Sequence, residues 1–400
     1  MPLNIYRILI DGILVIVGSI LLTYYRGTSN NENVFGAKET IVEVATLSKN
    51  QQDELYAIAR KLMEPGKGIL AADESIDTIG KRFAVIGIEN NAKNRKNYRH
   101  LLFTTTNISQ YISGIILHEE TFNQANYQFI IIYCASSIHS AKDDAGKSFV
   151  DIIREAGILP GIKLDKGLKQ FDRSSEYITN GLDDLKERAK YFKKGGCQFA
   201  KWRCVYVISK TTPSRKIMKE NAKILAQYAV SSQQAGLVPI IEPEVLCNGE
   251  HDLERTKKVT EQVLAEVYKS LHDCNVYLEG TLLKPNMVVT GSKSAEKVGH
   301  DKIANKTLTA LLRTVPAAVP GIVFLSGGQS ESDATRNLNE INKIKINKPW
   351  KLSFSYGRAL QTSALKAWMI HGPKEAQAIF RQRAKLNALA AEGNYIDDLE

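Results

Sequence analysis

The chain has 400 residues, of which 44% are hydrophobic and 24% are charged, and this composition is typical of a globular protein. Its length allows either two domains of ordinary size or one large α/β barrel. The net charge of +10 favours anionic partners, but the basic residues are scattered without a run of five or more, so a phosphorylated metabolite is favoured and no nucleic acid is expected.

Residues 1–45 are predicted to be an N-terminal extension outside the fold. The run "ILIDGILVIVGSILLTYY", between Arg7 and Arg26, is about as long as a membrane-spanning helix. Asp11 lies within the run, no small-residue cleavage site follows, and the next stretch is a polar linker. A membrane anchor and an ordinary cytoplasmic chain are therefore both open alternatives.

Beyond the extension, short apolar runs alternate with longer amphipathic stretches. The amphipathic stretches at 182–196 and 251–274 have apolar residues at roughly helical spacing. The strand-like runs cover 67–74, 112–119, 159–166, 199–207, 237–245, 276–285, 321–328 and 350–358. Eight strands alternating with helices predict a single (β/α)8 barrel over residues 46–400. An open doubly wound sheet is the alternative, but "AADES" after the first run is not the glycine-rich turn typical of that fold.

The segment 125–142, "ANYQFIIIYCASSIHSAK", interrupts this alternation because it lacks an amphipathic helix. It is interpreted either as an extra loop or short strand, or as the product of a gene-model error such as a retained intron. Since it follows the second run, we expect this insertion to lie at the mouth of the barrel.

Charged side chains end most of the predicted strands, and the chemistry of this fold lies at the carboxyl ends of its strands. Any one of them is more often an ordinary rim residue. As a set, however, they bring several lysines and carboxylates to one mouth, which is a costly arrangement for stability alone. The strand-end residues are Asp73, Glu74, Lys163, Asp165, Lys201, Arg203, Glu242, Glu244 and Lys284.

Such a set suits amine catalysis, with Lys284 as the nucleophile. A lysine of ordinary pKa is neutral in only roughly one molecule in 2,500 at pH 7. Burial and the neighbouring cations of Lys163 and Lys201 are expected to lower its pKa and free the amine to form a Schiff base with a carbonyl. Carboxylates then move the protons.

This chemistry requires no metal and no organic cofactor. The seven histidines show neither H-x-H nor H-E-x-x-H spacing, so no protein metal site is expected. The five cysteines form no C-x-x-C pair and their number is odd, which favours a reducing compartment.

The last two predicted strands end in motifs suited to a phosphate. "SGG" presents unobstructed backbone N–H groups and "YGR" adds a guanidinium, and phosphate sites after strands seven and eight recur in this fold. We also expect Arg82 to hold a second phosphate across the mouth. The residues of the first site are Ser326, Gly327, Gly328, Ser355, Gly357 and Arg358.

Taken together, "GILAADES", "GIKLDKG", "FAKWRCV", "IIEPEVL", "EGTLLKPNM", "FLSGGQS" and "SFSYGRALQ" resemble class I fructose-bisphosphate aldolase, in the order found in that family. The similarity extends from about residue 47 to about residue 395. It implies reversible cleavage of fructose 1,6-bisphosphate into dihydroxyacetone phosphate and glyceraldehyde 3-phosphate. It also implies a glycolytic role, a cytoplasmic homotetramer and no cofactor.

The resemblance assigns a role to each candidate. Lys284 matches the Schiff-base lysine, Glu242 the acid/base group and Asp73 the carboxylate that acts on the C4 hydroxyl. Lys201 matches the lysine that assists proton transfer and keeps Glu242 ionised. The remaining matches are Glu244 in support, Lys163 and Arg203 in ordering the site, Ser326, Gly327, Ser355, Gly357 and Arg358 at the C1 phosphate, and Ser75, Thr78 and Arg82 at the other phosphate.

Departures from the family pattern define an alternative function. The chain stops at "GNYIDDLE" without the family's terminal tyrosine, so we expect slow protonation of the enamine. Ile76 and Asp77 stand where the family has small residues, and Asp77 adds negative charge near a phosphate site. The alternative is a catalytically impaired aldolase-like protein retained for binding, for example to cytoskeletal partners.

Overall fold

The computed structural model of the protein describes residues 44, 46–124 and 147–397. The expected N-terminal extension, apart from residue 44, and the expected insertion at about 125–142 lie outside the described residues. No helix in the described part of the chain is both long enough and apolar enough to cross a bilayer.

The described chain forms a closed barrel of parallel strands, in the order β1-β10-β9-β8-β7-β6-β3-β2. Each predicted run contains one barrel strand, which confirms the (β/α)8 prediction and eliminates the open sheet. The barrel strands are β1 (Gly68–Ala72), β2 (Ile112–Leu117), β3 (Leu159–Lys163), β6 (Phe199–Tyr206), β7 (Val238–Val245), β8 (Leu282–Leu283), β9 (Gly321–Phe324) and β10 (Lys351–Tyr356).

Two segments differ from the predicted strands. The run at 276–285 is strand only at β8, because Leu278–Gly280 forms a 3-10 turn in which the Gly280 N–H donates to the Tyr277 carbonyl, 3.1 Å away. An antiparallel hairpin of β4 (Leu168–Gln170) and β5 (Tyr177–Thr179) also follows the third barrel strand. No apolar run predicts this hairpin, since β4 is the polar, exposed sequence "LKQ".

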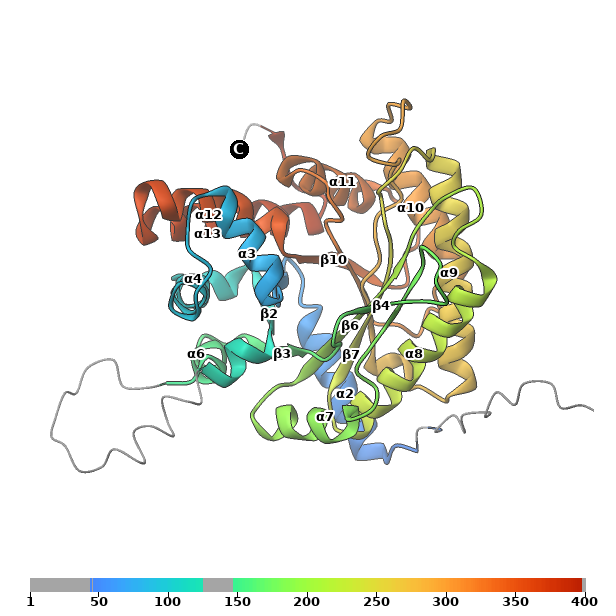
Figure 1. The fold of residues 1–400 in the computed structure, drawn as a ribbon, viewed down its shortest axis with the longest axis horizontal. Helices are drawn as coiled ribbons and strands as arrows, with labels where there is room; N and C mark the ends of the chain where they lie inside the picture. The colour runs from blue at the N-terminus through green and yellow to red at the C-terminus, as the bar shows by residue number, and fades with distance from the viewer. Residues whose placement is uncertain (1–43, 45, 125–146, 398–400) are drawn as a thin grey trace, which may run out of the picture. The chain divides into compact units, whose positions relative to one another are not determined.

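Helices lie outside the strands, as Figure 1 shows for α8 and α9 beside β6 and β7. The stretches expected at 182–196 and 251–274 form α7 and α9, the latter capped by Asp252, which accepts a hydrogen bond from the Arg255 N–H at 2.7 Å. The helices are α2 (Lys49–Leu62), α3 (Ile76–Val85), α4 (Ala92–Phe103), α6 (Phe149–Glu155), α7 (Leu185–Lys194), α8 (Arg215–Gln234), α9 (Leu253–Asp273), α10 (His300–Thr314), α11 (Glu331–Lys343), α12 (Arg358–His371) and α13 (Pro373–Ala391).

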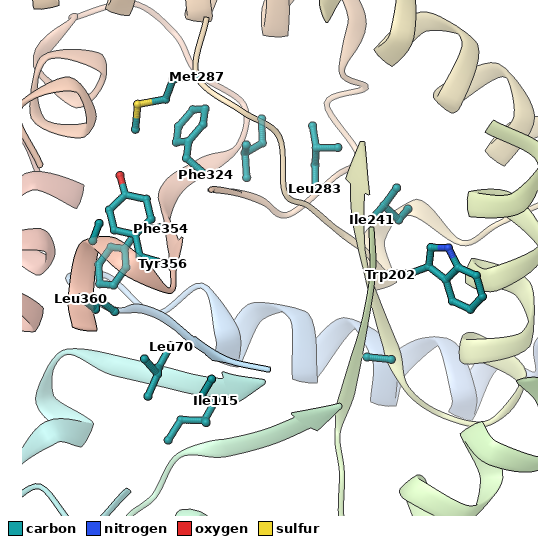
Figure 2. Packing of buried hydrophobic residues seen from close by; sticks show 14 of the residues in the cluster. Leu70, Ile115, Trp202, Ile241, Leu283, Met287, Phe324, Phe354, Tyr356 and Leu360 are labelled. Atoms are coloured by element: carbon teal, nitrogen blue, oxygen red, sulfur yellow. The ribbon is translucent and has the colours of Figure 1, made fainter. Parts of the chain in front are cut away.

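The two faces of the strands pack into two separate cores, because successive strand residues point to opposite sides. Figure 2 shows the outer core, where strand residues such as Leu70, Trp202 and Phe324 lie among the surrounding elements. The inner core joins Ile69, Ile240 and the other inward side chains to the buried face of α2. The parity of a strand residue therefore indicates whether its side chain enters the barrel.

Glycines in the inner core make room for the ring of Phe199. A Cβ added to Gly161 of β3 would lie 2.4 Å from two atoms of that fully buried ring. We therefore expect Gly161→Ala to lower the free energy of unfolding by about 1–3 kcal/mol, measured by urea denaturation at unchanged m-value. The double variant Gly161→Ala/Phe199→Leu should be more stable than the sum of the two single effects predicts. Strict additivity would contradict this steric explanation.

Candidate active site

A cavity of about 960 Å³ lies at the carboxyl ends of the barrel strands. Among the candidates from the sequence, only Gly328 does not line it. The residues lining it are Asp73, Ser75, Thr78, Arg82, Lys163, Lys201, Arg203, Glu242, Glu244, Lys284, Ser326, Gly327, Ser355, Gly357 and Arg358, together with neighbours discussed below.

The central charged side chains enter the cavity because they share the parity of the inner core. Ile240 and Leu282 belong to that core, so Glu242 and Lys284 continue the same inward faces two residues later. On β6, Lys201 lies between Ala200 and the outward-facing Trp202, which places its amine inside the barrel. The inward faces of neighbouring strands thus place charged side chains near the axis of the barrel.

Two lysines and two carboxylates form a continuous chain of contacts. The Lys284 amine lies 3.3 Å from Glu242 Oε1, and the Lys201 amine lies 2.9 Å from Glu242 Oε2. Lys201 also donates a hydrogen bond of 3.0 Å to Asp73 Oδ2. All four side chains are at most 10% exposed. The four groups therefore form one buried, connected network of charges.

The pKa values in this chain follow from burial and from these contacts. Burial by itself would raise the pKa of Glu242, but the cations of Lys201 and Lys284 hold it below the ordinary value. Asp73 likewise has a lowered pKa, because Lys201 and Lys284 outweigh the effect of its burial. Burial would lower the pKa of Lys201, yet Asp73 and Glu242 raise it. At neutral pH the resting site thus holds two carboxylates and a Lys201 ammonium.

Further ion pairs lie around this centre. Lys163 Nζ lies 3.1 Å from Asp165 Oδ1, and Arg203 forms an ion pair with Glu244 across β6 and β7. Burial would lower the pKa of Arg203, but the Glu244 carboxylate raises it above the ordinary value. Arg203 therefore remains a cation that fixes Glu244 beside the centre.

One end of the cavity has the features of an anion site. Gly327 has φ +54 and follows Ser326 in the turn after β9, and Arg358 begins α12 after β10. The Ser355 side chain is buried, and its Oγ has no hydrogen-bond partner among the described residues. Gly328 instead packs toward the Cys247 sulfur, since a Cβ added to Gly328 would lie 3.2 Å from Sγ.

Arg82 lies at this same end of the cavity. The sequence led us to expect it on the opposite side of the mouth. A Cβ built on Gly357 would be 3.7 Å from Arg82 Nη2. The reason is the barrel order: β1 pairs with β10, so the loop and helix after β1 lie beside the end of β10. Asp77 and Lys81 also line the cavity, in the same segment as Ser75 and Thr78.

Several lining residues were absent from the candidates. His118 and Glu119 follow β2, and the strand-end rule applied to the second run would have found them. Burial and the charge of Lys163 lower the pKa of His118, so its imidazole is neutral at pH 7. Lys166 and Leu168, which lead into the β4–β5 hairpin, also reach the cavity. Only the folded hairpin could have identified them.

Removing the unpaired hydroxyl of Ser355 should change phosphate binding without changing stability. Ser355→Ala should weaken binding of inorganic phosphate about 3- to 10-fold, because one donor to the anion is lost. The unfolding free energy should stay within about 0.5 kcal/mol of the parent, since no internal hydrogen bond is broken. Titration calorimetry and thermal unfolding measure the two effects. Unchanged phosphate affinity together with lost stability would show that Ser355 is structural.

Among the described residues, no group of three or more His, Cys, Asp or Glu side chains is arranged to hold a metal ion. The groups that the cavity offers are amines, carboxylates, hydroxyls and backbone N–H groups. They define a class of barrel enzyme in which a buried lysine stands next to paired carboxylates.

Comparisons with known proteins give the family. The profile of class-I fructose-bisphosphate aldolase matches residues 54–400. Fructose-bisphosphate aldolase 2 of Caenorhabditis elegans is 57% identical over 356 residues, covering 88% of this chain and 92% of the relative. Fructose-bisphosphate aldolase B of Gallus gallus is 51% identical, covering 88% of this chain and 93% of the relative. This chain belongs to the class I fructose-bisphosphate aldolase family and is an aldolase, a carbon–carbon lyase.

A solved structure agrees with this assignment. The fructose-bisphosphate aldolase of Plasmodium falciparum, in a ternary complex with TRAP and a small-molecule inhibitor, superposes with a TM-score of 0.81. It is 44% identical, and the match covers 90% of this chain and 99% of that one. The barrel described above is therefore the fold of this family.

Proposed function

We propose that this chain cleaves fructose 1,6-bisphosphate reversibly into dihydroxyacetone phosphate and glyceraldehyde 3-phosphate through a Schiff base on Lys284. The observation that carries the proposal is the buried Lys284 amine, 3.3 Å from a Glu242 carboxylate whose pKa is lowered. The Glu242 carboxylate is within reach of the amine, so it is placed to accept a proton as Lys284 adds to a carbonyl. The anion site at one end of the cavity supports a phosphorylated substrate.

In this mechanism the neutral Lys284 Nζ adds to the ketose carbonyl and forms a carbinolamine. Glu242 returns a proton to the carbinolamine hydroxyl, and water leaves as the iminium forms. Asp73 then accepts the proton of the C4 hydroxyl. The C3–C4 bond breaks, its electron pair passes into the iminium to give an enamine, and the aldehyde departs. Lys201, which is hydrogen-bonded to Asp73 and ion-paired with Glu242, balances the charge of both carboxylates.

We place this activity in glycolysis and gluconeogenesis, in a cytoplasmic homotetramer. A relative that is 54% identical is named as a cytosolic aldolase of Arabidopsis thaliana, and this supports the location. The complex of the Plasmodium falciparum aldolase with TRAP supports the binding of protein partners as well as substrate. Light scattering of the purified chain should give about four times the mass of the 44.5 kDa monomer, and a monomer would contradict the tetramer.

A catalytically impaired protein kept for binding, for example to cytoskeletal partners, is the less favoured function. The complete set of lysines and carboxylates argues against it, because burying four charges is costly unless they serve the chemistry.

Reduction with borohydride tests the proposal. Incubation with dihydroxyacetone phosphate and then borohydride should add one three-carbon unit to the peptide that contains Lys284, detected by mass spectrometry. Borohydride without the ketose should add nothing. Folded protein that shows no ketose-dependent adduct would exclude the Schiff base and favour the binding function.

A further inference from the structure

Glu74 is a buried carboxylate of the cavity wall that the mechanism above does not use. It follows Asp73 directly after β1, and consecutive residues there point to opposite faces. Asp73 has the parity of the inner core and meets Lys201, whereas Glu74 has the parity of the outer core and faces helices α3 and α4. Its side chain is 5% exposed.

Two arginines from those helices enclose Glu74. Arg82 of α3 donates a hydrogen bond of 2.5 Å to Glu74 Oε1, and Arg99 of α4 lies 2.5 Å from Oε2. Arg99 is 3% exposed and does not line the cavity, whereas Arg82 is 21% exposed and does. Burial would raise the pKa of Glu74, but the charges of Arg99 and Arg82 hold it below the ordinary value. The carboxylate is therefore ionised throughout the neutral range.

The hydrogen bond from Arg82 restricts where its guanidinium can lie. Nη1 is bound to Glu74, and Nη2 lies near Gly357, where a Cβ would be 3.7 Å from Nη2 and 3.8 Å from Glu74 Oε1. An arginine side chain otherwise has many rotamers, and ordering it on binding an anion costs entropy. Because the hydrogen bond to Glu74 already orders Arg82 in the free protein, less entropy is lost when the anion binds.

We infer that Glu74 is a positioning residue, which holds Arg82 beside Gly357 so that its guanidinium meets the substrate's phosphate group. Arg99 is the buried counter-ion that allows the Glu74 carboxylate to stay charged although its side chain is buried. The inference rests on the proposed phosphate site at the ends of β9 and β10, and it adds to that site a residue that does not touch the anion.

The simple electrostatic view predicts the opposite role, in which Glu74 competes with phosphate for Arg82. Two variants separate the two views. Arg99→Met removes the buried cation but keeps the Glu74–Arg82 hydrogen bond, so the two remaining charges cancel. Arg99→Met/Glu74→Gln also removes the carboxylate, so the wall gains one unit of positive charge while Arg82 loses its charged partner.

Positioning predicts that the double variant binds inorganic phosphate about tenfold more weakly than Arg99→Met, although it is more positive. Its KM for fructose 1,6-bisphosphate should rise by a similar factor, with kcat within about twofold. Competition predicts tighter phosphate binding in the double variant. Equal or tighter binding, measured by titration calorimetry on protein shown to be folded by circular dichroism, would overturn the inference.

A double variant that fails to fold is replaced by Glu74→Asp, which keeps the charge but is one methylene shorter. Weaker phosphate binding with an unchanged unfolding temperature then supports positioning, and unchanged binding overturns it. Arg358→Ala tests the underlying site independently. Loss of phosphate binding in Arg358→Ala with no effect of either Glu74 variant would keep the phosphate site and reject the role of Glu74. No effect of Arg358→Ala would reject the phosphate site itself.

Discussion

Lys284→Met should lower kcat for cleavage of fructose 1,6-bisphosphate by about four orders of magnitude or more and abolish borohydride trapping of the ketose. Without the amine no iminium forms, so the electrons of the C3–C4 bond have no acceptor. A loss of that size corresponds to a barrier higher by about 5.5 kcal/mol. Steady-state kinetics and mass spectrometry of the reduced protein measure the two effects.

Two control variants make this result specific. Lys284→Arg keeps the positive charge beside Glu242 but cannot form an imine, so it should be as inactive as Lys284→Met. Lys61→Met removes an exposed lysine of α2 and should keep both trapping and turnover.

 The Lys61 side chain is 49% exposed, forms an ion pair with Glu64 and is not among the residues lining the catalytic cavity. An adduct that persists in Lys284→Met on a different lysine would contradict the assignment.

Lys201→Met should lower kcat about 10²- to 10⁴-fold, because proton transfer by both neighbouring carboxylates depends on this cation. Lys201 is hydrogen-bonded to Asp73 and lies 2.9 Å from Glu242 Oε2. Its removal leaves two buried carboxylates with less compensating charge, and borohydride trapping should become slow without being abolished. Lys201→Arg, which keeps the charge, should retain more activity than Lys201→Met, and equal losses would show that charge is not what matters.

The pH dependence of Lys201→Met has a definite sign. In the parent, the pKa values of Asp73 and Glu242 are lowered against the opposing effect of burial, chiefly by Lys201. Both groups therefore add stability above their unfolded pKa of about 4, and that stability is lost as the pH falls through their lower folded values. Without Lys201 their pKa values rise, so the acidic limb of the pH–rate profile and the acid unfolding midpoint should both move to higher pH. An unmoved acidic limb would contradict this electrostatic role.

The alternation of apolar runs was enough to predict the barrel, because a parallel strand buried on both faces must be apolar along most of its length. The ends of these runs also identified Lys284, Glu242, Lys201 and Asp73, since a charge at the end of an apolar strand is a local feature of the chain. The same rule missed His118 only because it was not applied to the second run. The sixth run was predicted too long, since a local turn at Leu278–Gly280 uses the backbone groups that a longer strand would need.

By itself, then, the sequence determined the family, the positions of the strands along the chain and the types of group at the barrel mouth. Only the tertiary structure decided which groups meet. Closing the barrel brings β1 beside β10, so Arg82 lies near Gly357 and not across the mouth. It also brings Arg99 of α4 against Glu74. Such contacts join residues far apart in the chain, and their distances depend on how whole strands and helices pack, which no local pattern of residues records.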